Sequence, residues 1–253
     1  MSRPRRLLER IGVDVDDGGG GLPDRLGVRR HPERLLAAAL VVAVGGLVYA
    51  LAIDLFQYHS VNDDEGVYLY QAAMLLEGRL FIRPGAIPWE AVRPWFFVVD
   101  ETDAGVRLYS KYSPVAPAIF AVGRLLGDWN LALGGVAAGT AAGVYALGSA
   151  AFDRRVGLVA IPALAGAPLF LLTSATFLSY APATMLNVAF AVGYVRAART
   201  GSARWGAAAG TAIGLAVFCR PYTAVLFATP FVGHTVASLA IAWRRHAWTA
   251  AFR

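Results

Sequence analysis

Long runs of apolar residues recur along this chain and constrain its fold more than any other feature. The chain has 253 residues, 57% hydrophobic and 16% charged, and its mean hydropathy is +0.52. Several runs approach the roughly 20 residues that a helix needs to cross a bilayer. This excludes an ordinary soluble globular protein and predicts an all-α polytopic membrane protein with six or seven transmembrane helices. The apolar runs cover residues 35–56, 113–127, 129–152, 156–173, 177–196, 203–218 and 222–243.

The arginines between these runs predict the topology. Residues 1–34 are rich in arginine and lack apolar periodicity, which predicts a flexible basic tail in the cytoplasm. The run 113–127 is short for a span. If it lies at the membrane surface or re-enters, the later arginine-containing loops join the tail on the cytoplasmic side, as the positive-inside rule favours. We therefore expect six spans plus this segment rather than seven spans, in the plasma membrane, and no nucleic-acid binding.

Residues 57–112 form a polar interval that this topology places outside the cell, at the start of a transmembrane module of residues 35–253. Asn62 or Asp63 can cap a helix that ends at Gly78. Two short apolar stretches flank the residues 102–105, which are typical of a hairpin turn. We expect a small outer-face loop domain with one surface helix and one hairpin.

Three carboxylates, Asp63, Asp64 and Glu65, follow one another at the start of this helix, with Tyr68 one turn later. Such a cluster can supply a general base, or it can bind a divalent metal ion, with His59 as a further candidate ligand. The structural alternative is that the acids only stabilise the helix N-terminus through its dipole.

Two cations fall on the expected outer side. Lys111, the only lysine, precedes the run 113–127 and can hold a phosphate at the level of the lipid headgroups, or simply snorkel to the interface. Arg220 needs an anionic ligand or a partner in the bundle, and an ion pair with the acidic loop is the structural alternative. Ser179 and Tyr180 belong to a hydroxyl-rich loop that can bind a sugar or satisfy helix ends.

Taken in order, these pieces resemble the GT-C fold of integral membrane glycosyltransferases. The likeness is to the branch that contains protein O-mannosyltransferases and the aminoarabinose transferases of lipid A. It covers about residues 35–243 and includes an N-terminal signal anchor. The segments that carry it are Asp63-Asp64-Glu65-Gly66-Val67-Tyr68, Lys111-Tyr112-Ser113-Pro114, residues 174–180 and residues 214–221.

The resemblance implies transfer of a sugar from a polyprenyl-phosphate carrier to a lipid, glycan or protein acceptor at the outer membrane face. It implies that Asp64 is the catalytic base or orients the acceptor, with Asp63 and Glu65 supporting it or binding a divalent metal ion. It also implies that Lys111 and Arg220 hold the carrier phosphate. The expected substrate-binding residues further include Tyr68, Tyr112, Ser179 and Tyr180.

Two other functions stay open at this point. A transporter or lipid-handling protein would have the same composition, although its spans should contain more ionisable residues than these do. A non-catalytic subunit of a glycosylation complex would retain the module without activity. Relatives are usually longer, so the resemblance is to an N-terminal module of such enzymes, and it leaves open whether this short chain is active.

Overall fold

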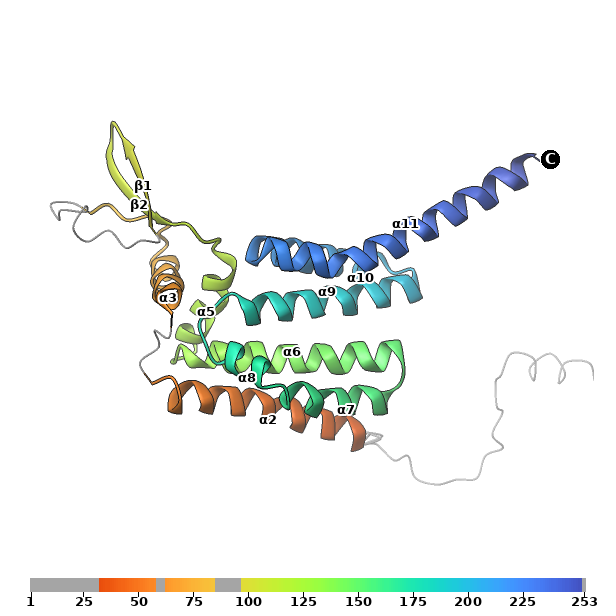
Figure 1. Cartoon of the computed structure of the whole chain (residues 1–253), viewed down its shortest axis with the longest axis horizontal. Coiled ribbons are helices and arrows are strands. Elements are labelled where there is room, and N and C mark those ends of the chain that lie inside the picture. The colour runs from red at the N-terminus through yellow and green to blue at the C-terminus, as the bar shows by residue number, and fades with distance from the viewer. Residues whose placement is uncertain (1–31, 58–61, 85–96, 252–253) are drawn as a thin grey trace, which may run out of the picture. The chain divides into compact units, whose positions relative to one another are not determined.

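The computed structural model describes residues 32–57, 62–84 and 97–251, with the side chains of 245–251 excepted. The predicted tail therefore lies outside the described residues, apart from its last three residues, which open α2. The strands are β1 (Phe97–Thr102) and β2 (Gly105–Ser110). The helices labelled in Figure 1 are α2 (Pro32–Asp54), α3 (Asp63–Leu76), α5 (Val115–Leu125), α6 (Asn130–Ala151), α7 (Arg154–Ala165), α8 (Pro168–Ser174), α9 (Tyr180–Thr200), α10 (Ala203–Cys219) and α11 (Pro221–Ala251).

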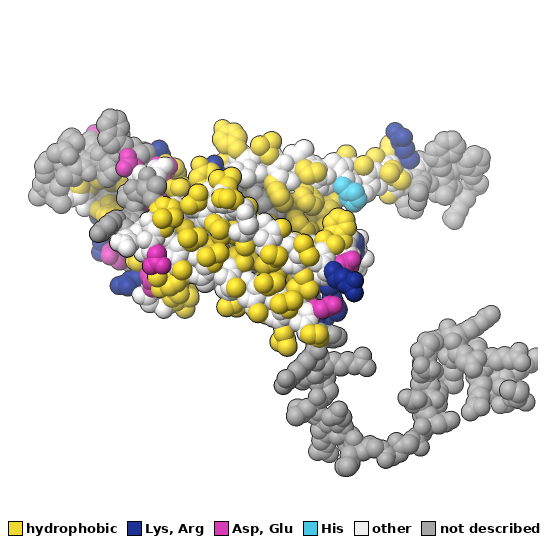
Figure 2. All heavy atoms as spheres, turned by 60° about the horizontal axis from the view of Figure 1, so that its bottom comes forward, with side chains coloured by type: hydrophobic (Ala, Val, Ile, Leu, Met, Phe, Trp, Pro, Cys, Tyr) yellow, Lys and Arg dark blue, Asp and Glu magenta, His cyan; other side chains and the backbone are white. Residues whose placement is uncertain are grey.

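The longer helices lie side by side as a bundle (Figure 1). α2 packs on α6, α6 also packs on α7 and α9, and α9, α10 and α11 contact one another. At the contact of α2 with α6, a Cβ on Gly45 would lie 2.9 Å from the carbonyl oxygen of Gly134. Small residues allow this close approach of helix backbones in a membrane. Large apolar side chains cover much of the outside of the bundle, as contact with lipid requires (Figure 2).

Three of the described helices are long and apolar enough to cross a membrane: α2, α6 and the part Pro221–Arg244 of α11. α7 and α8 pass the same test only as a pair that is bent by 71°. With 11 residues in α5 and 17 in α10, these two helices are shorter than a typical crossing. The described structure is thus mostly helical and consistent with a helical membrane protein, whereas the six or seven spans are not confirmed.

The apolar run 156–173, expected as one span, forms two helices, α7 and α8. α7 ends at Ala165, Ala167 has an extended backbone (φ −87°, ψ 109°), and Pro168 opens α8. Proline lacks an N–H group and disfavours the helical conformation at the residue before it. The helix therefore breaks at this point, although the hydropathy of the run is continuous.

Between α2 and α5 the structure has a helix and a hairpin at the expected positions. The Asn62 side chain caps α3 by accepting a 2.9 Å hydrogen bond from the backbone N–H of Asp64. After α3, Gly78 adopts a φ of 68°, which glycine allows at little cost. β1 pairs antiparallel with β2. α3 packs on α5 and runs across the ends of the bundle helices rather than along them (Figure 1).

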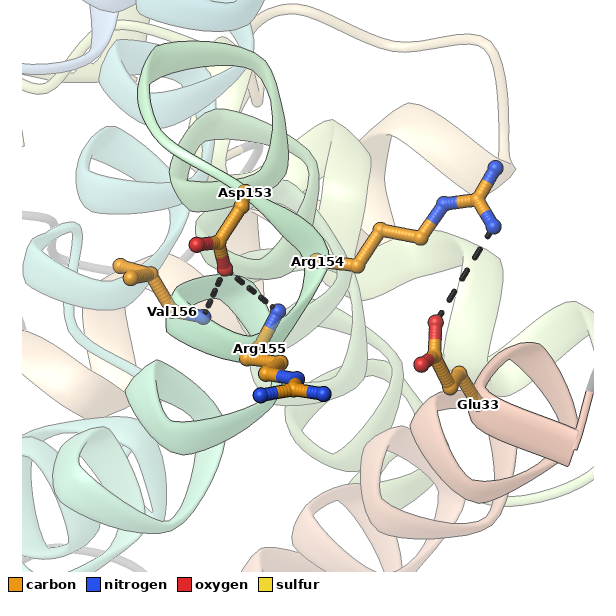
Figure 3. A network of polar contacts seen from close by, with 5 residues as sticks. All are labelled: Glu33, Asp153, Arg154, Arg155 and Val156. Atoms are coloured by element: carbon orange, nitrogen blue, oxygen red, sulfur yellow. Dashed lines mark hydrogen bonds and ion pairs between the residues drawn. The ribbon is translucent and has the colours of Figure 1, made fainter.

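The other end of the bundle carries the starts of α2 and α7. Asp153 caps α7, and its Oδ1 accepts hydrogen bonds from the backbone N–H groups of Arg155 at 2.8 Å and Val156 at 2.9 Å (Figure 3). The Arg154 guanidinium lies 4.0 Å from the carboxylate of Glu33 at the start of α2 (Figure 3). Arginines thus lie at the end of the bundle where α2 and α7 begin, opposite to the end that carries α3 (Figure 1).

The glycine contact between α2 and α6 can be tested by adding one methyl group. Gly45→Ala should lower the free energy of unfolding by about 1–3 kcal/mol, because the new Cβ meets the Gly134 carbonyl and lies 3.0 Å from the Cβ of Ala138. Gly46→Ala is the matched control, since its Cβ would meet no atom within 4 Å. Thermal unfolding in detergent measures both variants, and equal midpoints would contradict the close helix contact.

Candidate active site

Glu65 is fully buried in the first turn of α3. Its Oε1 accepts a 2.7 Å hydrogen bond from the backbone N–H of Phe177, in the segment between α8 and α9. A buried carboxylate without such donors would be strongly destabilising. The bond therefore fixes the start of α3 to the bundle.

Asp64 is half-buried beside Glu65 and faces Tyr112. The Tyr112 hydroxyl donates a 2.7 Å hydrogen bond to Oδ1 of Asp64, and Nε2 of Gln71 donates to the backbone carbonyl of Tyr112 at 3.1 Å. Burial raises the pKa of Tyr112, and the hydrogen bond to Asp64 raises it further. The hydroxyl thus stays protonated and remains a donor. A carboxylate has about four acceptor positions, so Asp64 can accept further hydrogen bonds besides the one from Tyr112.

Tyr68 contacts two of the other residues that the sequence singled out, Tyr112 and Ser179. Its ring stacks on that of Tyr112 with 4.8 Å between centroids, and the Ser179 side chain hydrogen-bonds its hydroxyl. Burial raises the pKa of Tyr68, the Ser179 hydrogen bond lowers it, and the charges of Asp64 and Arg220 act on it in opposite directions. Two charges of opposite sign, from distant parts of the chain, thus both affect the pKa of this hydroxyl.

Arg220 connects α10 to α11. Its backbone is extended (φ −151°, ψ 91°), as is usual for a residue before proline. Its Cζ lies 3.8 Å from the centroid of the Tyr180 ring, and its Nε donates to the Thr223 hydroxyl at 3.4 Å. Among the described residues, no ion pair joins Arg220 to the acids of α3. An aromatic ring thus holds the guanidinium without neutralising it.

Lys111 is exposed where the chain leaves β2. Its Nζ lies 4.9 Å from the centroid of the Tyr112 ring, which connects it through Tyr112 to Asp64. The Cys219 thiol donates to the backbone carbonyl of Ser179 at 3.6 Å and joins the end of α10 to the start of α9. The structure therefore brings together Asp64 and all six predicted substrate-binding residues: Tyr68, Lys111, Tyr112, Ser179, Tyr180 and Arg220.

The expected metal ligands do not form one set. Asp63 is exposed, and His59 lies outside the described residues. In the part of the chain that the structure describes, no group of three or more His, Cys, Asp or Glu side chains is arranged to hold a metal ion. Asp64 and Glu65 direct oxygens to different protein donors, the Tyr112 hydroxyl and a backbone N–H. The neighbouring acids thus do not fit a joint metal site.

Sequence reasoning missed three residues that build this site: Gln71, Phe120 and Phe177. The Phe120 ring meets the rings of Tyr68 and Phe177 edge-on, with centroid distances of 6.4 and 5.3 Å. Gln71 follows Asp64 by seven residues, and this helical spacing puts both on one face of α3. That spacing was a usable signal for Gln71. The backbone N–H of Phe177 has no sequence signal, because every residue except proline carries one.

The Glu65 hydrogen bond predicts a large stability difference between two glutamates of the same region. Glu65→Ala should lower the free energy of unfolding by about 2–4 kcal/mol, because it removes a buried charged acceptor. Glu77→Ala is the control and should cost about 0–1 kcal/mol, since Glu77 is exposed and pairs with Arg79 at 3.3 Å. Chemical unfolding in detergent measures both. Similar losses for the two variants would mean that Glu65 does not hold α3 in place.

Comparison with known proteins gives a family match for this chain. No curated protein matches the chain. The family model for dolichyl-phosphate-mannose-protein mannosyltransferase matches residues 111–252, which is more than half of the chain. The match begins at Lys111 and includes Ser179, Tyr180 and Arg220, and the contacts described above join the acids of α3 to this part. The chain belongs to the dolichyl-phosphate-mannose-protein mannosyltransferase family.

Proposed function

We propose that this chain transfers a sugar from a polyprenyl-phosphate carrier to an acceptor at the outer face of the plasma membrane. Its family supports a membrane glycosyltransferase that uses a lipid-linked donor. One set of contacts carries the proposal: Asp64 accepts a hydrogen bond from Tyr112, whose ring stacks on that of Tyr68, and Arg220 lies over the ring of Tyr180. Sugar transfer from a phosphate needs both kinds of group near each other, a base for the acceptor and a cation for the departing phosphate.

The distribution of charge supports the outer-face placement. Arg154 contacts Glu33 at the start of α2, and Arg199 donates to the carbonyl of Ala151 at 3.3 Å, so the arginines after α6 and in the last turn of α9 share one end of the bundle. Loops rich in arginine stay in the cytoplasm. We infer that this end and the N-terminus are cytoplasmic, and that the acids of α3 face outward.

In the proposed step, Asp64 takes the proton from the acceptor hydroxyl or amine as this group attacks the anomeric carbon of the sugar. A bond forms between the acceptor and this carbon, and the bond from the carbon to the phosphate oxygen breaks. The electron pair of the broken bond stays on the phosphate. Lys111 and Arg220 stabilise the negative charge that develops there.

The neighbouring residues support this step. The Tyr112 hydroxyl orients Asp64, and the buried carboxylate of Glu65 positions the turn that carries it. Asp63 adds negative charge beside them. We assign Tyr68, Ser179 and Tyr180 to the sugar, since hydroxyls and aromatic faces are the groups that bind carbohydrate rings.

Replacing Asp64 tests the proposed base. Asp64→Asn should lower the rate of sugar transfer from a polyprenyl-phosphate donor by about 10²–10⁴-fold, since the amide cannot take the proton. Tyr112→Phe keeps the ring stack, loses the 2.7 Å hydrogen bond, and should lower the rate about tenfold. Asp103→Asn, at the exposed hairpin turn, is the control.

Donor binding is measured in the same variants and should stay nearly constant. If Asp64→Asn transfers sugar at the rate of the unchanged chain, Asp64 is not the base. If the unchanged chain binds the donor but transfers sugar only with a second subunit present, the non-catalytic alternative is correct.

Replacing Arg220 tests the proposed phosphate site separately. Arg220→Gln should lower kcat/KM by about 10²–10³-fold, because the leaving phosphate loses its cation. Arg220→Lys retains the charge but loses the planar contact with Tyr180, so an intermediate loss is expected. Arg124→Gln, on the exposed last turn of α5, removes the same charge elsewhere and should leave transfer unchanged. Equal kinetics of Arg220→Gln and Arg124→Gln would exclude Arg220 from the site.

A further inference from the structure

Two arginines lie over one phenylalanine ring beside the hairpin, and neither is among the residues assigned to sugar transfer. The Cζ of Arg107, on β2, is 5.0 Å from the centroid of the Phe81 ring, and that of Arg83 is 5.8 Å from it. Backbone hydrogen bonds of 2.8 and 2.9 Å between Ile82 and Leu108 hold the segment after α3 antiparallel to β2. This pairing places Arg83 next to Arg107.

Among the described residues, no ion pair balances the positive charge of this arginine pair. Asp100 lies opposite Arg107 in the hairpin register, but within the described residues neither Arg83 nor Arg107 forms an ion pair. The Nε of Arg107 is buried and has no hydrogen-bond partner there. The nearby Arg79, in contrast, pairs with Glu77. Neighbouring like charges and a buried donor without an acceptor both destabilise the loop, and a bound anion would relieve both.

Exposed apolar side chains adjoin the same arginines. Leu80 is 68% exposed, and Leu76 and Phe81 are 38% and 37% exposed. Residues 78–83 line an open hollow of about 560 Å³. Apolar side chains next to arginines are typical of surfaces that dock at the lipid interface, where the arginines meet phosphates and the apolar groups enter the acyl boundary. A site for a small soluble anion would not need the exposed leucines.

We propose that Arg83 and Arg107 bind the phosphate of an anionic phospholipid, with Leu80 and Phe81 at the acyl boundary beside it. α3 runs across the ends of the bundle helices, and the hairpin extends from α3 away from the bundle core (Figure 1). The loop after α3 thus lies where lipid headgroups surround a membrane protein. The charge of the pair selects an anionic lipid over a zwitterionic one. This contact fastens the hairpin to the membrane surface and does not depend on the proposed sugar transfer.

A reporter placed in the site tests this proposal on the full chain in detergent. Leu80→Cys is labelled with a polarity-sensitive fluorophore in a Cys219→Ser background, which removes the one other cysteine. The probes are dioctanoyl phosphatidylglycerol, dioctanoyl phosphatidylcholine and inorganic phosphate. Phosphatidylglycerol should shift the emission to the blue. Arg83→Gln and Arg107→Gln should each weaken its binding about fivefold, and together about 25-fold.

Arg124→Gln is the matched control and should bind like the parent, because Arg124 is an exposed arginine on α5. Native mass spectrometry then compares phosphatidylglycerol binding by the unlabelled chain and by its unlabelled Arg83→Gln/Arg107→Gln variant. A loss of binding in this variant shows that the label itself does not create the site. The proposal is overturned if Arg83→Gln and Arg107→Gln bind phosphatidylglycerol like Arg124→Gln. It is also overturned if phosphatidylcholine binds equally well, or if inorganic phosphate binds as tightly, which would indicate a site for a soluble anion.

Discussion

The hydrogen bond between the Glu65 carboxylate and the Phe177 N–H decides how α3 meets the bundle. Successive residues of an α-helix point about 100° apart, so turning Glu65 into the bundle sets the directions of its neighbours. Asp64 then faces Tyr112, and Asp63 points to solvent. Three acids that look equivalent in the sequence thereby acquire three different environments. Because the three acids point in different directions, they do not form a joint metal site, and Asp64 alone lies beside Tyr112.

The tyrosines explain why the opposite charges of the site do not simply cancel. Asp64 accepts a hydrogen bond from the Tyr112 hydroxyl, while Arg220 lies over the Tyr180 ring, and Tyr68 stacks on Tyr112. A direct ion pair would stabilise the fold only modestly but would oppose the binding of both a neutral acceptor and an anionic donor. Holding each charge against an aromatic side chain leaves both charges available. The ion pair between Arg220 and the acidic loop, weighed from the sequence, is accordingly not seen in the described part of the chain.

Local features of this protein followed from the sequence, whereas long-range ones did not. Asn62 and Gly78 mark the limits of α3, and the turn after β1 marks the hairpin, because caps and turns depend on neighbouring residues. The candidate site residues were identified by residue type and order. Their partners were not identified, because Glu65 and Phe177 are far apart in the chain and every residue except proline carries a backbone N–H. The break before Pro168 was missed because hydropathy does not reveal that a proline disfavours the helical conformation at the residue before it.

The family match begins at Lys111, so the proposed base on α3 precedes the matched segment while the proposed phosphate ligands lie within it. The two halves of the proposed reaction, proton removal and phosphate release, thus belong to different parts of the chain. They meet only if α3 is held in register with the bundle. Glu65 supplies that constraint at the start of α3, and the bridge between Ile82 and Leu108 supplies another beyond its end by joining it to β2. Because β2 leads directly into Lys111 and Tyr112, whatever steadies the hairpin also steadies the side chains that face Asp64.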